Sequence, residues 1–382
     1  MTADTMAVET RQATGLRALR NAVAGIIAAG IGTGVQASLH TMDGRGLDFA
    51  YGWTAEGVEL TPRTRFPLAC ATKAITAALV LEECRRHGID RETPLARFIP
   101  EFGDNGKQDV TIRQLLTNTH GIAEPRSVAE QMVLPVESRF ELLCQAGLHS
   151  EWDPDVQASY SPGAGFEALG PLVELLTARR FADHYDATLG RSLGSLTFLA
   201  DFAGTRRQAA IEAAPVTAFS WLADGTHEAD TGRGIEADSL VSMIYSGSPA
   251  YGAVGCASDL CRLWLLIGGA AHEGNDELIH PSVARAMTSI QCGPRYDRTL
   301  RRDVEYGYGV LPRLAPLRPW GFPAELTERS YGHLGLSQVF GGFVPEWGAA
   351  FAIVVNGRTA KLLELAALRQ VFGGLARFAK ES

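Results

Sequence analysis

The sequence predicts an α/β fold in which an antiparallel sheet flanked by helices is interrupted by an all-helical subdomain. Two observations support this prediction. Segments rich in β-formers and punctuated by turns lie near both ends of the 382-residue chain, and helical patterns with polar breaks fill the middle, from about 95 to 240. We therefore expect a discontinuous α/β domain over 1–95 and 241–382 and a helical subdomain over 96–240.

The elements near the N-terminus follow from periodicity and turn residues. An amphipathic helix is expected first, ending in the apolar stretch Ala22 to Ala29. Two extended runs, Val35 to His40 and Leu47 to Tyr51, flank an Asp-Gly turn and indicate a hairpin. A helical pattern then begins at Cys70 and stops at Gly88, a residue type that commonly follows a helix C-terminus.

The remaining elements show the change from helices to strands along the chain. Three helical patches are expected in the middle, over Thr111 to Leu116, Ser138 to Leu148 and Gly165 to Ala178. Near the end, a second hairpin is expected from Ser337 to Val344 and Ala349 to Val355, followed by an amphipathic helix over Ala360 to Ala379. The two hairpins would build one sheet from both ends of the chain.

Composition and charge exclude several classes of protein. Apolar residues make up 46% and charged residues 20%, which indicates a large core, and the net charge of −8 disfavours a nucleic-acid binder. We find no apolar run of the roughly 20 residues that a membrane span needs and no secretory-signal pattern, so we expect a cytoplasmic protein with reduced thiols. No cofactor is expected, and the scattered cysteines lack metal-site spacing: Cys70, Cys84, Cys144, Cys256, Cys261 and Cys292.

The helix that begins at Cys70 carries the strongest candidates for chemistry. Eleven of the twelve residues from Cys70 to Leu81 are uncharged, and Lys73 is the exception. A buried ammonium costs desolvation unless it is paired or neutral. Residues three apart share a helix face, so the Cys70 thiol would lie beside a cation at a helix start, a setting that favours thiolate. An inert packing cysteine and a lysine that reaches solvent remain the alternative reading.

Three ordered motifs resemble the β-lactamase-related serine hydrolases, the superfamily of class C β-lactamases, penicillin-binding proteins, family VIII esterases and related acyltransferases. The resemblance covers residues from about 15 to 378. It includes two segments between the motifs, Leu95 to Phe102 and Val110 to Gly121. The superfamily carries Ser-x-x-Lys, Tyr-x-Asn and Lys/His-Thr-Gly. The matching segments are Cys70-Ala-Thr-Lys73, Tyr160-Ser-Pro162 and His333-Leu-Gly335. The resemblance implies a β-lactamase-like (DD-peptidase-like) fold with an active-site cleft between the two domains.

Three departures from the superfamily pattern bear on the substrate. Cys70 replaces the nucleophilic serine, Pro162 replaces the asparagine of the second motif, and Leu334 stands where the third motif has its hydroxyl. The second and third departures remove groups that would hold a β-lactam carboxylate. They argue against β-lactam hydrolysis.

The resemblance also implies roles for individual residues. Cys70 would attack a carbonyl while Lys73 or Tyr160 takes its proton, and Tyr160 would relay a proton to the leaving group. His333 is a further candidate base, as the partner of a Cys-His pair. The backbone N–H groups of Cys70 and Leu336 would form the oxyanion hole. The expected substrate-binding residues are His333, Gly335, Pro162 and Trp221.

A cysteine nucleophile would form a thioester, which reacts with amines, alcohols and thiols more readily than an oxygen ester does. We therefore expect an acyltransferase or cyclase of small-molecule biosynthesis that uses a thioester donor bound to a carrier protein or to coenzyme A. The alternatives are an esterase, including one in which Cys70 is an engineered replacement of serine, and a catalytically retired binding protein. The arginines between Arg295 and Arg302 are expected in a solvated loop, with carrier docking as the alternative. The oligomeric state is not predicted.

Overall fold

The computed structural model describes residues 3–54, 57–127, 130–131, 134–199, 245–274, 278–314, 326–335, 339–357 and 365–380. Two expected site residues, Trp221 and Leu336, lie outside these ranges. Residues 336–338, at the start of the expected strand Ser337 to Val344, also lie outside these ranges. The same holds for residues 358–364, at the start of the expected helix Ala360 to Ala379.

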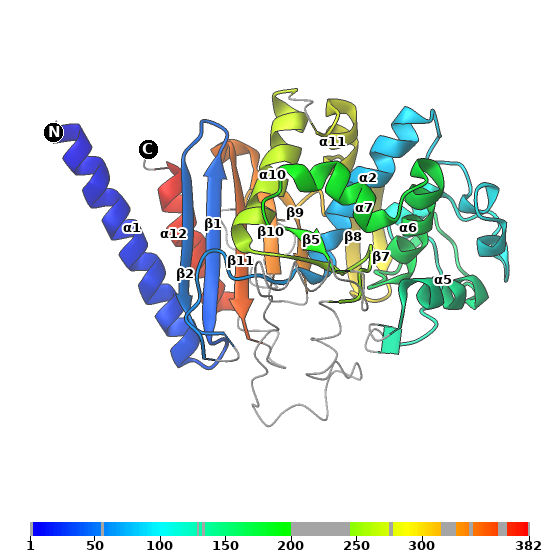
Figure 1. The fold of residues 1–382 in the computed structure, drawn as a ribbon, viewed down its shortest axis with the longest axis horizontal. Coiled ribbons are helices and arrows are strands. Elements are labelled where there is room, and N and C mark those ends of the chain that lie inside the picture. The colour runs from blue at the N-terminus through cyan, green and yellow to red at the C-terminus, as the bar shows by residue number, and fades with distance from the viewer. Residues whose placement is uncertain are drawn as a thin grey trace.

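A five-stranded antiparallel sheet built from both ends of the chain is the main element of the fold (Figure 1), as the sequence predicts. Its spatial order is β2-β1-β11-β10-β9, and each neighbouring pair is antiparallel. The strands are β1 (Gly34–Thr41), β2 (Gly46–Gly52), β9 (Tyr331–Gly335), β10 (Val339–Val344) and β11 (Ala349–Asn356). Both predicted hairpins are confirmed, and β1 joins them by pairing with β11.

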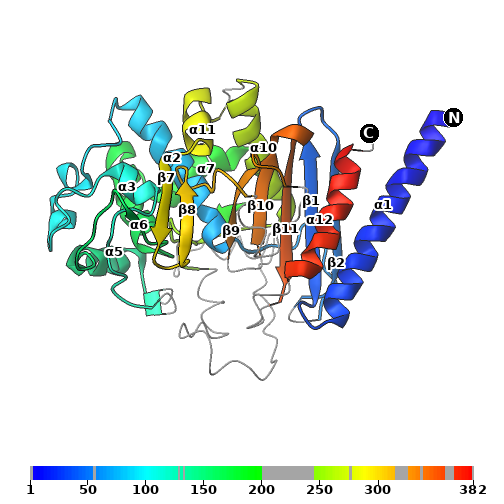
Figure 2. The same ribbon diagram turned by 180° about the vertical axis from the view of Figure 1, so that it is seen from behind.

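Helices cover both faces of this sheet (Figures 1 and 2). Helices α1 (Ala3–Ala28) and α12 (Leu365–Lys380) pack together on one face, and α10 (Ala257–His272) packs on the other. Strand β11 alternates between the two layers: Ile353 and Val355 belong to the core under α1 and α12, whereas Ala352 and Val354 belong to the core on the opposite side. Burial on both faces explains why this strand is almost continuously apolar.

The remaining helices form a second region beside the sheet. The predicted helices in the middle of the chain are confirmed as α3, α5 and α6, and the helix after Cys70 as α2. The bounds of the helices in this region are α2 (Lys73–Arg86), α3 (Ile112–Leu116), α5 (Val136–Gln145), α6 (Ala164–Thr177), α7 (Phe181–Ala187) and α11 (Pro281–Thr288). Short 3₁₀ turns lie at Ala69–Thr72, Leu95–Arg97, Pro100–Gly103, Leu189–Arg191 and Pro345–Trp347. A small antiparallel sheet joins β3 (Phe66–Pro67), β6 (Ala253–Gly255) and β5 (Thr197–Phe198).

The arginine-rich segment forms a β-hairpin rather than the expected solvated loop. Strands β7 (Cys292–Asp297) and β8 (Arg302–Tyr306) pair antiparallel, and β7 also pairs in parallel with β4 (Gln157–Ala158) (Figure 2). The side chains of Val304 and Tyr306, both in β8, are buried in the core. These two residues alternate with charged residues, which is the pattern of a strand with one buried face. The many arginines of this segment concealed that pattern in the sequence.

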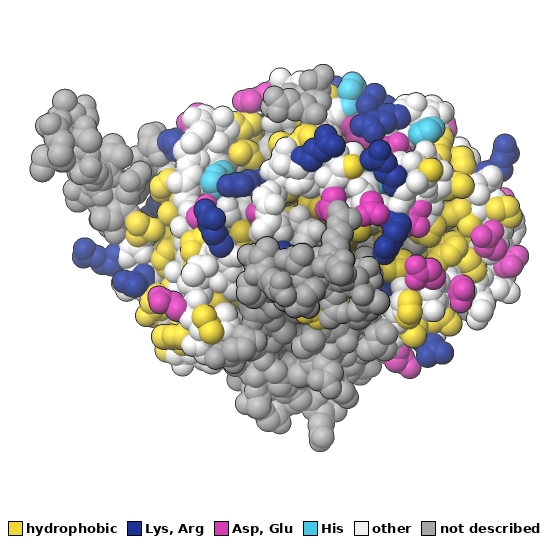
Figure 3. All heavy atoms as spheres, viewed as in Figure 1, with side chains coloured by type: hydrophobic (Ala, Val, Ile, Leu, Met, Phe, Trp, Pro, Cys, Tyr) yellow, Lys and Arg dark blue, Asp and Glu magenta, His cyan; other side chains and the backbone are white. Residues whose placement is uncertain are grey.

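A groove of about 570 Å³ opens in the helical region between α5 and the loop that contains Pro249. Acidic side chains gather over α5 on this side of the molecule (Figure 3), and Glu137, Glu141 and Glu174 line the groove. Neither Cys70 nor Lys73 lines it, so it is not the site of the predicted chemistry.

All six cysteines are free thiols. None of the described helices is long and apolar enough to cross a membrane. Within the described ranges, no group of three or more His, Cys, Asp or Glu side chains is placed to hold a metal ion.

Asp48 links the edge of the main sheet to α10. Its carboxylate accepts hydrogen bonds from Ser38 Oγ (2.6 Å), His40 Nε2 (3.0 Å) and Ser258 Oγ (3.1 Å). Partial burial opposes ionisation, but the hydrogen bonds from His40 and Ser38 outweigh it and lower the pKa of Asp48 from 3.8 to about 2. A carboxyl whose pKa is lower in the folded state stabilises the fold above its unfolded pKa and loses that contribution as the pH falls.

We therefore expect Asp48→Asn to lower the free energy of unfolding by about 1 kcal/mol at pH 7, because an amide cannot accept all three hydrogen bonds. The difference from wild type should persist at pH 5 and shrink by pH 3. Urea unfolding at the three pH values measures it. Asp109→Asn, at an exposed position, is the control. If the free energies of unfolding of wild type and Asp48→Asn differed equally at pH 7 and pH 3, ionisation of Asp48 would not be the source of the stabilisation.

Candidate active site

Cys70 lies in a sharp backbone turn that leads into α2. It belongs to the 3₁₀ turn Ala69–Thr72, and Ala69 adopts a left-handed conformation with φ of 48°. Such a conformation is unfavourable for a residue other than glycine and persists only where the surroundings impose it. The turn is held by the Ala253 backbone, whose carbonyl accepts from Leu68 N (2.8 Å) and whose N–H donates to Thr72 Oγ1 (3.1 Å). The Cys70 side chain is only 9% exposed.

Strand β9 ends against this turn at Gly335. A Cβ at position 335 would lie 2.4 Å from the Leu68 carbonyl oxygen and 3.3 Å from Cys70 N. The first distance is shorter than any real contact, so only glycine fits here. The Cys70 backbone N–H therefore lies at the junction of β9 with the turn Ala69–Thr72, where the sequence analysis expects the oxyanion hole. The second expected donor, Leu336, lies outside the described residues.

Lys73 is fully buried next to this turn, and its amine is held by two backbone carbonyls. Nζ donates to the carbonyl oxygen of Pro162 at 2.7 Å and to that of Ala250 at 3.2 Å. It also lies over the rings of Tyr160 and Phe166, at 5.4 and 5.3 Å from their centroids. Backbone carbonyls only accept hydrogen bonds, so both contacts use N–H groups of the amine. The two carbonyls thereby fix the position of the Lys73 amine beside the turn that carries Cys70.

Pro162 therefore contributes to the site through its backbone. The sequence pattern places a proline where the superfamily has an asparagine, and its side chain supplies no polar group. Its carbonyl nevertheless binds Lys73. Glu124 fixes this loop, because its Oε1 accepts from Ser161 Oγ (2.5 Å) and from the N–H groups of Gly163 and Ala164 (both 3.1 Å) at the start of α6.

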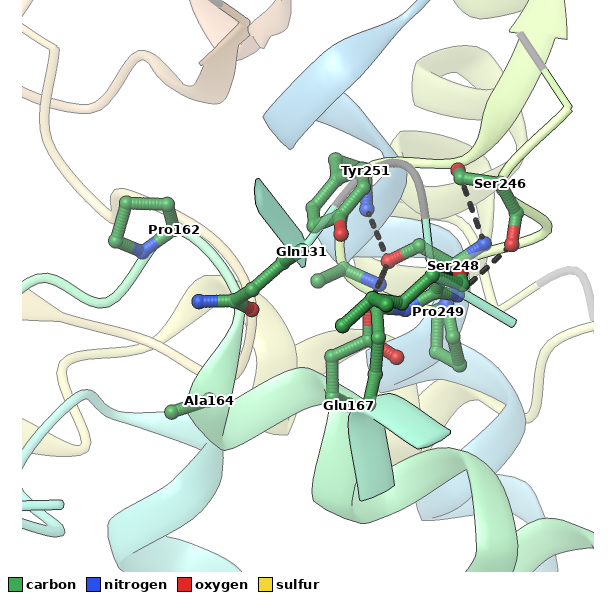
Figure 4. Close-up of polar contacts among 12 residues, drawn as sticks. Gln131, Pro162, Ala164, Glu167, Ser246, Ser248, Pro249 and Tyr251 are labelled. Atoms are coloured by element: carbon green, nitrogen blue, oxygen red, sulfur yellow. Dashed lines mark hydrogen bonds and ion pairs between the residues drawn. The ribbon is translucent and has the colours of Figure 1, made fainter. Parts of the chain in front are cut away.

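The second carbonyl that binds Lys73 is held by a buried ion pair. Arg139 Nε lies 2.9 Å from Glu167 Oε1, and both side chains are almost fully buried. Ser248 Oγ donates to the Glu167 carboxylate and accepts from Ala250 N at 3.0 Å; Figure 4 shows Ser248 next to Glu167. Arg139 also donates to the Ser246 carbonyl at 2.8 Å. The ion pair thus orders the loop that presents the Ala250 carbonyl, and the sequence analysis did not identify it.

Tyr160 borders both Cys70 and Lys73. Burial and the neighbouring Cys70 thiol raise the pKa of the Tyr160 hydroxyl well above its usual value. The hydroxyl therefore stays protonated near neutral pH, and its chemistry is that of a proton donor. The sequence-predicted Cys70, Lys73 and Tyr160 are brought together by the fold.

Asp297 holds Tyr160 in place, and no motif marked it as a site residue. Its carboxylate is fully buried at the end of β7. Oδ2 accepts from Tyr160 N (2.8 Å) and from the Tyr306 hydroxyl (2.7 Å). Oδ1 accepts from Thr299 N (2.9 Å) and Leu300 N (2.8 Å). Four donors therefore converge on the two carboxylate oxygens of Asp297.

His333 lies across the site from Tyr160, with 6.2 Å between the two ring centroids. Burial and the charge of Lys73 lower the pKa of His333 to about 3. A histidine that is this weakly basic is a poor acceptor for the proton of a thiol. His333 is thus disfavoured among the three bases that the sequence left open, and Lys73 and Tyr160 stay predictions.

Comparison with known proteins assigns the family. Residues 20–372 match the family model described as Beta-lactamase. The chain belongs to the beta-lactamase family. It is 24% identical over 322 residues to the Mycobacterium tuberculosis protein named Esterase/beta-lactamase LipL, covering 80% of this chain and 71% of that protein. It is 28% identical over 155 residues to Esterase EstB of Burkholderia gladioli, covering 34% and 37% of the two chains.

Solved structures share the whole fold of this beta-lactamase family member. A penicillin-binding protein homologue from Caulobacter crescentus has a TM-score of 0.72 at 19% identity and covers 94% of this chain and 98% of its own. EstCE1 has a TM-score of 0.73 at 17% identity, with coverage of 95% and 99%. SurE has a TM-score of 0.67 at 23% identity, with coverage of 95% and 76%. The predicted β-lactamase-like fold is confirmed.

We expect Asp297→Asn to lower the rate of p-nitrophenyl butyrate hydrolysis by about 10- to 100-fold, since misplacement of a catalytic group by about 1 Å can cost 100-fold. The amide can accept from at most two of the four donors and turns its own N–H₂ towards the others. Steady-state kinetics of the folded variant measure the effect.

The loss should fall on kcat more than on KM, because Tyr160 is expected to transfer a proton in the reaction. Asp303→Asn, in β8 of the same hairpin but exposed, is the matched control. An Asp297→Asn enzyme as active as wild type would show that the carboxylate does not position Tyr160.

Proposed function

We propose that this protein transfers acyl groups through an acyl-cysteine intermediate on Cys70, from a thioester-activated donor carried by a carrier protein or coenzyme A. The observation that supports this most is the position of the Cys70 thiol. It occupies the nucleophile turn of the beta-lactamase fold, with its backbone N–H beside Gly335 and with Lys73 and Tyr160 next to it. In this proposal the product belongs to small-molecule biosynthesis.

The proposed reaction proceeds in two steps. The Cys70 sulfur attacks the donor carbonyl as its proton passes to Lys73 Nζ, and the Cys70 N–H, with that of Leu336, stabilises the oxyanion. The carbon–sulfur bond to the donor breaks, and the Tyr160 hydroxyl, reprotonated from Lys73, delivers the proton to the leaving thiolate. An acceptor alcohol or amine then attacks the thioester, loses its proton through Tyr160 and restores the Cys70 thiol.

Two considerations support transfer over hydrolysis. The acyl-cysteine is a thioester and keeps its reactivity towards amines and alcohols. EstCE1, which shares the fold, is described as a hydrolase with promiscuous acyltransferase activity. The names of LipL and EstB support the second candidate, an esterase in which water attacks the same intermediate.

We expect iodoacetamide at pH 8 to modify Cys70 before the other cysteines. Burial raises the pKa of Cys84 and Cys144 to about 11 and that of Cys256 and Cys261 to about 12, so these thiols are protonated at pH 8. Burial raises the pKa of Cys292 too. Peptide mapping by mass spectrometry measures the order of modification. Cys70→Ala should abolish the fast phase, and a fast phase that survives in this variant would contradict the prediction.

We also expect intact-protein mass spectrometry to detect one butyryl group on wild type after brief exposure to the N-acetylcysteamine thioester of butyrate, and none on Cys70→Ala. With butylamine present, Cys70→Ser should shift the product ratio from amide towards free acid, because an oxygen ester reacts less readily with amines than a thioester does. An unmodified wild-type protein across a panel of thioesters would refute the acyl-cysteine mechanism.

A further inference from the structure

The strand that carries the third motif places a histidine at the site, at a position where the family pattern has lysine or histidine. We propose that His333 selects acyl groups bearing a neutral hydrogen-bond donor, an amide N–H or a hydroxyl, and discriminates against acyl groups bearing a carboxylate at the same place. This inference deepens the proposed function and rests on acylation of Cys70.

The direction of the His333 side chain follows from the alternation of strand β9. Gly335 faces the nucleophile turn, because a Cβ there would meet the Leu68 carbonyl. His333 is two residues away and shares that face, whereas Leu334 points to the opposite side and packs in the core with α1 and α12. The contact of His333 with the Tyr160 ring agrees with this placement. The imidazole therefore borders the space in front of Cys70.

The tautomer of His333 is fixed by its one hydrogen bond. Nδ1 lies 2.7 Å from the Leu334 carbonyl oxygen. A carbonyl only accepts, so Nδ1 carries the hydrogen and Nε2 of the neutral ring presents a lone pair. Among the described residues, no group forms a hydrogen bond with Nε2. A substrate N–H or O–H can therefore be its partner.

The charges around the ring oppose its conversion to a cation. Burial and the charge of Lys73 both hold the pKa of His333 down, and no described carboxylate raises it. Two N–H groups of Lys73 are engaged by the Pro162 and Ala250 carbonyls. A substrate carboxylate placed against the ring would face the lone pair of His333 Nε2. Leaving a buried polar group unpaired costs about 1–3 kcal/mol, which corresponds to roughly 5- to 150-fold in rate.

Three N-acetylcysteamine thioesters of nearly equal shape test the selectivity: glutaramoyl (amide donor), 5-oxohexanoyl (acceptor only) and glutaryl (carboxylate). For wild type we expect kcat/KM for Cys70 acylation to be at least 5-fold higher for glutaramoyl than for 5-oxohexanoyl, and lowest for glutaryl. His333→Leu should remove the preference for the amide over the ketone, and His333→Lys should favour glutaryl. Tyr331→Phe, on the same strand and face, should keep the wild-type order. A wild type that prefers glutaryl, or a His333→Leu variant with unchanged selectivity, would overturn the proposal.

Two further measurements separate this proposal from the acyl-cysteine mechanism. Calorimetry of the same thioesters binding to Cys70→Ala measures selectivity in the absence of acylation. The affinity should be highest for glutaramoyl, lower for 5-oxohexanoyl and lowest for glutaryl. If wild type is not acylated but this order holds, the acyl-cysteine mechanism fails and the selectivity stands. The ¹⁵N spectrum of histidine-labelled protein, with His333 assigned by His333→Gln, should show a neutral ring with hydrogen on Nδ1 at pH 5. A doubly protonated ring at that pH would overturn the proposal.

Discussion

The burial of one amine organises the active site. Lys73 is enclosed without an acidic partner among the described residues, and two backbone carbonyls hold it, one from the loop before α6 and one from the loop before β6. A buried polar group needs such partners, so both loops must keep their positions for the lysine to be tolerated. Each loop has its own carboxylate, Glu124 for the first and Glu167 for the second. The amine and its loops therefore stabilise one another.

Carboxylates surround the site without forming an ion pair with its amine. Glu124, Glu167 and Asp297 each accept hydrogen bonds from backbone N–H groups or hydroxyls that position catalytic groups. The groups that line the site include the Cys70 thiol, a protonated tyrosine and a neutral imidazole. Such an interior suits an uncharged acyl group, because charges that develop during the reaction are then stabilised by fixed dipoles rather than by counterions.

Reasoning from the sequence predicted the features of the fold and site that depend on local residue patterns. It predicted the sheet from both ends, both hairpins, the helix after Cys70 and the convergence of Cys70, Lys73 and Tyr160. It missed the β7–β8 hairpin, where arginines obscured the alternation of Val304 and Tyr306. It also missed interactions in which the backbone is a partner, such as the Pro162 carbonyl on Lys73 and the Tyr160 N–H on Asp297. No residue type encodes a carbonyl, and a carboxylate distant in sequence leaves no local signal.

The pairing of β1 with β11 affects how the enzyme is made. The nucleophile turn is synthesised early, whereas β9, which completes its surroundings, belongs to the last part of the sheet to leave the ribosome. Sheets whose strands are far apart in sequence close late in folding. A nascent chain therefore carries the Cys70 thiol without Gly335 beside it. The surroundings of Cys70 are therefore completed only when the strands from the two ends of the chain have paired.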